Sequence, residues 1–352
     1  MSNVTIRDIA KALNVAPSTV SSCLSGNAAR RISQKRIEQV RRKAEEMGYI
    51  PNILASRIFR RNNKKYLGII VKNDTSINST QPVLNHIVNS LSLRKDCDFS
   101  ILYSQADNLQ TTIRNGVGLG ITDFIIIGYL RGTDLKKINF DKLPPLHIFA
   151  ANYYFDSGDF PAPSVFKKIG FARDAYYQNL KGFLEKSGHG PVVIVQALEE
   201  GQSIPDDSET VFYEISDIKN VFRFGYEIAP QVLKLIRQGK CRTLLLRNDD
   251  IAIGVMEYLL ENGVKIPEDV AIIGFNNTPF ADYAKIPLSS VALSVQENAD
   301  ILIKHILEKE ELADTTYRQP TLVLRKSTPA DWNWTDFDGI IEYNPPGKDN
   351  NP

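Results

Sequence analysis

Three short side chains within the first thirty residues lie where a helix of this type usually carries its DNA-contacting groups. The stretch VTIRDIAKALNVAPSTVSSCLSG, Val4 to Gly26, has the pattern of two short helices joined by a turn, a shape that many proteins insert into a DNA groove. Where such a helix usually carries long polar side chains, this one offers Pro17, Ser18 and Ser22. A serine hydroxyl makes few hydrogen bonds and discriminates weakly between bases. Selection of a DNA site by this helix therefore has to use other interactions as well.

Residues 1–65 are strongly basic. They contain 14 Lys+Arg against 4 Asp+Glu, whereas the remaining chain contains 28 against 37. A basic head on a mildly acidic body is the charge pattern expected of a protein that binds a polyanion. The alternative interpretation is that a run of charge is merely a solvated face. The cations available to neutralise phosphates are Lys11, Arg30, Arg31, Lys35, Arg57, Arg60 and Arg61.

Three predicted helices position these side chains. The first runs from a cap at Thr5 or Asn3 to about Leu13, with apolar residues at the i, i+3, i+4, i+7 spacing of one helix face. The second begins near Pro17, because proline suits the first helical turn. The third spans about residues 33–47. Three short helices with this turn predict a helix-turn-helix head.

The chain after residue 65 alternates apolar runs with helical patterns, which predicts βαβ units and parallel sheets. The predicted strands are 66–71, 99–104, 123–128, 146–150, 192–197, 210–215, 243–247 and 270–275. The predicted helices are 82–94, 106–118, 170–187, 225–239, 250–262 and 296–310. Two runs of this alternation indicate two doubly wound halves with a cleft between them.

Polar residues follow several predicted strands directly. Asp74 and Thr75 follow the first strand, Asn248 and Asp249 follow TLLLR, and Asn276 follows IIGF. Ligands of doubly wound folds bind beyond the carboxyl ends of the strands, so these side chains are candidate ligand contacts. The alternative is that Asn and Asp simply cap turns and helices at these points.

The chain resembles the lactose/galactose-repressor family of bacterial transcription regulators. The resemblance rests on TIRDIAKALNV, STVS, GYIPNILA, NDDIAIG and PEDVAIIGFNN and covers residues 4 to about 328. It implies an all-α helix-turn-helix head and an α/β body of two doubly wound parallel-sheet subdomains of periplasmic-binding-protein type. The expected divisions are a head at 1–50, a hinge helix and linker at 51–65, a body at 66–328 and a tail at 329–352. The N-subdomain is expected at about 66–163 and 296–320, and the C-subdomain at about 164–295 and 321–328.

The resemblance also implies which residues contact DNA. In this family the second helix enters the major groove, and paired hinge helices enter the minor groove, where an apolar side chain separates two base pairs. The matching DNA-contacting residues here are Thr5, Pro17, Ser18, Thr19, Ser21, Ser22, Asn52 and, following Ala55, Ile58. Arg30, Arg31 and Arg57 are further expected DNA contacts, as cations that neutralise phosphates.

The head departs from the family pattern in ways that weaken direct contacts to bases. Ser22 stands where arginine is common, and serine cannot grip guanine with two hydrogen bonds. Ala16 replaces a serine that would cap the second helix, and the loop NAARRIS carries about two extra residues. The hinge has Ser56 and Ile58 where arginine and leucine are usual. We therefore hypothesise that recognition depends more on phosphate contacts and DNA shape than on base contacts.

The effector site departs from the family pattern too. The resemblance implies that Asn248 and Asn276 contact an effector, but the position of Asn276 is usually aspartate. Family members usually place a helix, and an arginine that anchors the effector, where this chain has the short stretch EEGQSIPDDSE. Arg223 and Arg247 are candidate replacements, although each is equally interpretable as a surface residue. We hypothesise an altered or degenerate small-molecule pocket with candidate contacts at Asp74, Thr75, Asn248, Asp249 and Asn276.

Other classes of function find no support in the sequence. The histidines lack metal-ligand spacing, no phosphate-binding loop or nucleophile elbow is present, and we expect no metal, cofactor or enzyme activity. No apolar run approaches the roughly 20 residues that span a bilayer, and no secretory signal is present. Cys23, Cys97 and Cys241 fit free thiols in a reducing cytoplasm.

The sequence thus predicts a cytoplasmic, nucleoid-associated regulator that binds an operator in double-stranded DNA. We expect a homodimeric repressor of a carbohydrate-utilisation operon, controlled by a small effector such as a sugar or sugar derivative. Two alternatives remain open. One is a regulator whose degenerate pocket leaves control to a protein partner, and the other is a DNA-binding head fused to a sugar-handling enzyme.

Overall fold

The computed structural model describes residues 4–24, 32–47, 49, 64–72, 77–104, 108–128, 130, 132–154, 166–198, 210–214 and 221–343. The chain divides into two compact units, Met1–Asn63 and Lys64–Pro352. The predictions for Arg30, Arg31, Asn52, Ala55, Arg57, Ile58, Asp74 and Thr75 lie outside the described residues.

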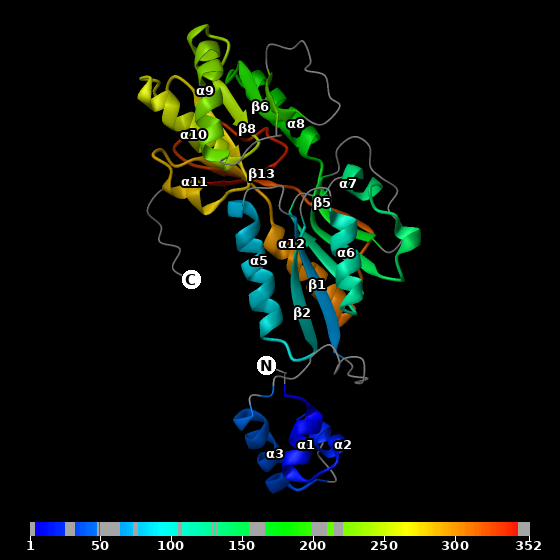
Figure 1. Ribbon diagram of the computed structural model, residues 1–352. Coiled ribbons are helices and arrows are strands. Elements are labelled where there is room, and N and C mark those ends of the chain that lie inside the picture. The colour runs from blue at the N-terminus through cyan, green and yellow to red at the C-terminus, as the bar shows by residue number, and fades with distance from the viewer. Residues whose placement is uncertain are drawn as a thin grey trace. The chain divides into compact units, whose positions relative to one another are not determined.

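The head is a bundle of three helices, as predicted (Figure 1). They are α1 (Ile6–Leu13), α2 (Pro17–Leu24) and α3 (Gln34–Glu46). Apolar side chains from all three helices meet in one core, which contains Ile9, Val20, Cys23 and Val40 at 0% exposure. A core of this size is small, so the angles between the helices depend on a few close contacts.

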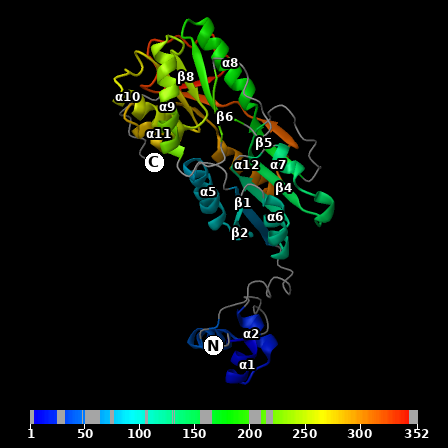
Figure 2. The same cartoon turned by 45° about the horizontal axis from the view of Figure 1, so that its top comes forward.

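The first sheet of the body has the strand order β11-β5-β4-β3-β1-β2, and all its pairs are parallel. Its strands are β1 (Lys65–Lys72), β2 (Cys97–Ser104), β3 (Asp123–Ile127), β4 (His147–Tyr154), β5 (Phe166–Phe171) and β11 (Thr315–Tyr317). One face packs on α5 (Ile77–Ser92) and α12 (Val295–Glu308). The other packs on α6 (Leu109–Gly118) and α7 (Gly132–Lys136), and a short 3-10 helix, Phe140–Lys142, follows α7. Figures 1 and 2 show α5 and α6 beside this sheet.

The second sheet has the order β13-β12-β10-β9-β8-β6-β7 and is parallel except for the pair β10–β12. Its strands are β6 (Val192–Leu198), β7 (Thr210–Glu214), β8 (Thr243–Leu246), β9 (Ala271–Phe275), β10 (Ser289–Ala292), β12 (Thr321–Leu324) and β13 (Ile340–Tyr343). One face packs on α9 (Val221–Arg237), α10 (Asp249–Glu261) and α11 (Pro279–Tyr283). The other packs on α8 (Arg173–Lys186) and on Trp332, Trp334 and Phe337.

Two expected boundaries differ from the observed sheets. Phe166–Phe171, assigned from sequence to the C-subdomain, forms β5 of the first sheet, where Lys168 lies buried with its Nζ 4.6 Å from the centre of the Tyr153 ring. Residues after 328, assigned to a tail, contribute β13 and an aromatic cluster to the second sheet. Both segments are rich in polar residues, so neither has the apolar pattern that marks a buried strand.

Helices α9 and α10 cross in close backbone contact. A Cβ added at Gly254 would lie 2.1 Å from the carbonyl oxygen of Phe222, and one added at Gly225 would lie 2.3 Å from that of Ile251. No real Cβ tolerates such a distance to a rigid backbone atom. The two glycines are therefore required by the packing of these helices on the second sheet.

We predict that Gly254→Ala destabilises the protein by about 1–3 kcal/mol or more, because the two helices must move apart. Gly182→Ala in α8 is the matched control, since nothing lies within 4 Å of its added Cβ. That change should be neutral or stabilising by about 0.5–1 kcal/mol through the lower chain entropy of alanine. Urea unfolding of the full chain measures both, and equal effects of the two substitutions would contradict the close contact.

Candidate functional site

The second helix of the head presents its short side chains outward. Val20 and Cys23 point into the helical core, and Leu24 packs against it. The opposite face carries Pro17, Ser18 and Ser21, which are exposed, while Thr19 and Ser22 are half-buried. The predicted base-contacting and phosphate-contacting residues of α2 thus lie on the surface and not in the core. The outward face of α2 therefore carries uncharged hydroxyl and pyrrolidine groups.

Thr5 caps the first helix of the head. Its hydroxyl donates to Asp8 Oδ2 over 2.7 Å and accepts from the Asp8 backbone N–H at 3.4 Å, while the Thr5 N–H donates to Asp8 Oδ2 at 2.8 Å. The hydrogen bond from the Thr5 side chain, followed by that from its backbone, lowers the pKa of the Asp8 carboxyl. This capping box fixes where α1 begins. The Thr5 hydroxyl is exposed, so a phosphate contact would have to share it with the cap.

The described part of the head also carries exposed positive charge on α1 and α3. The exposed cations include Arg7 and Lys11 on α1 and Lys35, Arg36 and Arg41 on α3. Arg42 and Lys43 pair with Glu46 within α3, at 3.7 Å and 3.1 Å. Exposed pairs of this kind are weak. The head therefore offers cations to a polyanion without having to break strong internal bonds.

Asn248 in the body acts as a helix cap. Its side-chain oxygen accepts from the N–H groups of Asp250 at 2.8 Å and Ile251 at 3.2 Å, at the start of α10. The capping interpretation of this residue is therefore correct for its oxygen. The residue is half-buried and lies two residues after the end of β8, so its amide nitrogen is the group left for an effector contact.

The side chain of the candidate contact Asp249 is buried, where a ligand cannot reach it. Its side chain is 0% exposed. Oδ1 accepts from the Ser290 hydroxyl at 2.6 Å, and Oδ2 accepts from the Thr278 N–H at 2.7 Å. Burial raises the pKa of this carboxyl to about 7. Asp249 therefore holds β10 and the loop after β9 in place, and its proposed role as an effector contact is withdrawn.

Asn276 lies at the carboxyl end of β9 in a left-handed backbone conformation, with φ 95°. Its N–H donates to the carbonyl oxygen of Val291 at 2.9 Å. The neighbouring Asn277 accepts from Arg325 Nη2 at 2.8 Å and so belongs to the framework. Asn276 is half-buried and remains the candidate effector contact of this loop.

The two candidate replacements for the missing arginine lie in different environments. Arg223 is 77% exposed and pairs with Glu227 one turn along α9, at 2.9 Å. Arg247 directly follows β8 and is only 11% exposed; its Nη1 lies 2.6 Å from Asp174 Oδ1, and its guanidinium lies 5.1 Å from the centre of the Tyr177 ring. The structure therefore favours Arg247.

Sequence reasoning missed two further cations at strand ends. Arg173 follows the end of β5 and lies 3.3 Å from the same Asp174. Lys72 is the last residue of β1, is 1% exposed, and pairs with Asp134 at 2.9 Å. For Lys72 the available signal was a charged residue at the end of an apolar strand, because such a position lies at the carboxyl edge of the sheet. No such signal marked Arg173, because β5 lacks the apolar pattern of a buried strand. Within the described ranges, no group of His, Cys, Asp and Glu side chains is placed to hold a metal ion.

The buried carboxyl of Asp249 predicts a pH dependence of stability. Its folded-state pKa of about 7 lies above the ordinary value of 3.8, so the fold favours the protonated form. This contribution is fully present below the ordinary pKa and is lost as pH rises through about 7. We expect the stability advantage of the native protein over Asp249→Asn to shrink between pH 4 and pH 8, measured by urea unfolding. A pH-independent difference would contradict the shift.

Comparison with known proteins agrees with both parts of the chain. Residues 5–52 match the family described as bacterial regulatory proteins, lacI family, and residues 206–328 match the periplasmic binding protein-like domain. In the described part of the chain, no helix is both long and apolar enough to span a membrane.

Relatives and solved structures are similar over nearly the whole chain. The NTD biosynthesis operon regulator NtdR of Bacillus subtilis is 26% identical, with 92% of this chain and 99% of that protein covered. The transcriptional repressor PurR of Vibrio parahaemolyticus is 24% identical, with 92% and 98% covered. A structure of the lac repressor dimer bound to operator and the anti-inducer ONPF is 18% identical, covers 94% of this chain and 100% of its own, and has a TM-score of 0.69. With its three-helix head and its body of two parallel-dominated sheets, the chain combines a DNA-binding head that matches the lacI family of bacterial regulatory proteins with a periplasmic-binding-protein-like body, and the relatives named above are transcription regulators.

Proposed function

We propose that this protein is a sequence-specific DNA-binding repressor, acting in the cytoplasm on nucleoid DNA, whose operator affinity is set by a small effector. The observation that carries the proposal is the outward face of α2, with Pro17, Ser18 and Ser21 exposed in a basic head. A two-sheet body of periplasmic-binding-protein type supports the effector part. Among relatives of this design, the lac repressor was solved as a dimer bound to operator.

The active form we propose is a homodimer. One helix-turn-helix head contacts only a half-site, and paired heads about one helical turn apart match a near-palindromic operator. A single head with side chains as short as those of Ser18 and Ser22 would also bind too weakly to select a site among genomic DNA. In a dimer the two heads bind together, so the preference of each head for its own half-site contributes to the choice of one operator.

Affinity and specificity then come from different parts of the head. Exposed cations such as Lys11 and Lys35 neutralise phosphates without regard to sequence. Pro17 adds an apolar contact for a thymine methyl. The remaining specificity comes from the energy of deforming the operator, which depends on base pairs that the protein does not touch.

This division predicts an unusual pattern of operator sensitivity. Sites are first selected from genomic fragments at moderate salt and then scanned by fluorescence anisotropy, one base pair at a time. We expect changes in the half-site facing α2 to cost less than about 1 kcal/mol each, whereas changes at the central step cost about 1–3 kcal/mol. The opposite pattern would refute recognition by shape, and failure to bind any genomic fragment would refute the repressor itself.

The effector we propose is a sugar derivative that carries an anionic group. Asn276 replaces the usual aspartate, so the loop after β9 carries one negative charge fewer. Arg247 and Arg173 bring two guanidinium groups to one carboxylate, Asp174, near the carboxyl end of β8. Guanidinium groups bind carboxylates and phosphates in bidentate fashion. The site therefore favours a sugar acid or sugar phosphate over a neutral sugar.

Calorimetry of the full chain against neutral sugars, sugar acids and sugar phosphates tests this specificity. Arg247→Gln should weaken binding of the anionic ligand at least tenfold, since hydrogen bonds to charged groups contribute about 1.5–3 kcal/mol. Arg223→Gln, exposed on α9, is the matched control and should change nothing. Tight binding of an ordinary neutral sugar that requires Asn276 and not Arg247 would contradict an altered pocket.

A second candidate function follows from the shortened segment between β6 and β7. Residues 199–209 connect two parallel strands, whereas a crossover usually takes a dozen or more residues. If this edge were closed to metabolites, a protein partner would take the place of the effector. The enzyme alternative has less support, because the relatives named above are regulators.

A further inference from the structure

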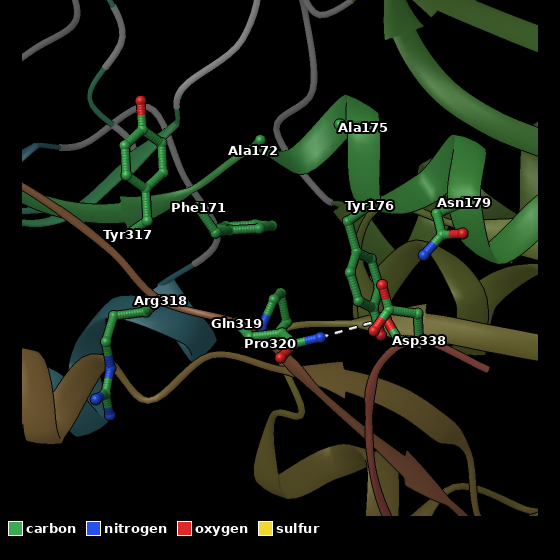
Figure 3. Close-up of a pocket in the computed structure, with 10 residues that line it drawn as sticks. All are labelled: Phe171, Ala172, Ala175, Tyr176, Asn179, Tyr317, Arg318, Gln319, Pro320 and Asp338. Atoms are coloured by element: carbon green, nitrogen blue, oxygen red, sulfur yellow. Dashed lines mark hydrogen bonds between the residues drawn. The ribbon is translucent and has the colours of Figure 1, made fainter. Parts of the chain in front are cut away.

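A separate pocket lies where the chain passes between the two sheets (Figure 3). Its volume is about 430 Å³, within the range of small-molecule sites. One wall is the segment after β5, with Phe171 and Ala172, which leads into α8. Another is Tyr317–Pro320, which joins β11 of the first sheet to β12 of the second. Asp338, just before β13, completes it.

This pocket differs from the effector site proposed above. Its lining contains none of Asn248, Asn276 and Arg247. It is bounded by the first turns of α8 and by the connection β11–β12, whereas those three residues follow β8 and β9. Arg173 and Asp174 of the effector site belong to the same first turn of α8, but neither lines this pocket. A ligand in this pocket would therefore contact the connections between the sheets and not the strand ends of the second sheet.

Tyr176 supplies a polar group that lacks a partner. The residue is 8% exposed, and its hydroxyl is buried without a hydrogen-bond partner in the described part of the chain. Burial raises the pKa of this phenol, so the hydroxyl stays protonated and able to donate. The ring is held by Phe337, with centroids 6.1 Å apart at 81°. Figure 3 shows Tyr176 extending toward Asp338 and Gln319. A buried hydroxyl without a partner is rare in native proteins and indicates a missing hydrogen-bonding group.

The other lining residues define the chemistry of that missing group. Phe171, Ala172, Ala175 and Pro320 form an apolar wall. Asn179 and Gln319 each offer an amide, which both donates and accepts, and Asp338 offers a carboxylate. Gln319 Nε2 also donates to the carbonyl oxygen of Asp338 at 3.3 Å and so ties two walls together. A ligand that fits must both donate and accept beside an apolar surface.

The charge of the pocket excludes an anion. Its cation, Arg318, is already bound by Glu297 of α12, with Nη2 and Oε2 2.6 Å apart. The carboxylate of Asp338 would repel a second negative charge. Hydroxyl groups are the simplest groups that donate and accept at once, and the C–H face of a saturated ring suits an aromatic and aliphatic wall.

We propose that this pocket, defined as the crossover pocket, binds an uncharged, hydroxyl-rich ring compound of monosaccharide size as a second ligand. Its Tyr176 hydroxyl donates to a ligand oxygen, and Asn179 and Asp338 accept from ligand hydroxyls. Because the walls belong to two connections between the sheets, the volume of the pocket changes when the sheets move. A ligand bound there favours the sheet arrangement that fits it best and so modulates the response to the first effector.

Isothermal calorimetry of the full chain with a panel of neutral monosaccharides and cyclic polyols tests the proposal. Tyr176→Phe keeps the ring and removes the hydroxyl, so it should weaken binding about five- to tenfold. Ala175→Leu places a larger side chain of high helix propensity at an exposed position of α8 and should abolish binding by filling the pocket. Thermal unfolding confirms that both variants fold.

The controls separate this site from the effector site. Arg247→Gln should leave binding of the neutral ligand unchanged, and Ala175→Leu should leave binding of an anionic sugar unchanged. The proposal is overturned if no neutral compound on the panel binds. It is equally overturned if one binds with the same affinity to Ala175→Leu and Tyr176→Phe, since that ligand would lie elsewhere.

Discussion

A buried carboxyl group and a buried guanidinium group hold the loop after β9, and the geometry of the effector site depends on this constraint. From α10, Asp249 accepts hydrogen bonds from Ser290 and from the Thr278 N–H. From the end of β12, Arg325 is 6% exposed, donates to Asn277 and to the carbonyl oxygen of Leu288, and pairs with Asp282. A loop bonded from both sides cannot easily change conformation, because each broken bond would leave a buried polar group unsatisfied. Asn276 is therefore presented in one fixed orientation.

The sequence revealed the parts of the fold that the hydrophobic effect dominates. Strands β1, β3, β6, β8 and β9 appear as apolar runs because parallel strands are buried on both faces. Strand β10 was missed because it begins with Ser289 and Ser290, whose hydroxyls are satisfied inside the protein by Thr328 and Asp249. Those partners are distant in sequence, so periodicity could not show that these serines are buried.

For the candidate site, the sequence predicted which residues follow the strands but not the direction in which their side chains point. Position after a strand correctly marked Asn248, Asn276 and Arg247 as residues near the carboxyl edge of the second sheet. It could not show that Asp249, one residue further on, turns inward, since a helix start sends neighbouring side chains in different directions. The crossover pocket was not predictable at all. Its walls come from three segments that meet only after both sheets have formed.

The short side chains of α2 gain importance from this design. A helix with long polar contacts would tolerate a body that positions the heads only approximately, because each contact is strong by itself. In the proposed dimer, Pro17, Ser18 and Ser22 would make weaker contacts, so DNA affinity would depend more on the spacing of the two heads and on the deformation that this spacing imposes on the operator. A movement of the two sheets of the body relative to each other would also alter the spacing of the two heads. The effector releases DNA by binding one body conformation more tightly than the other. If the head makes weak base contacts, a smaller difference between these two affinities is enough for release than with a head that makes strong base contacts.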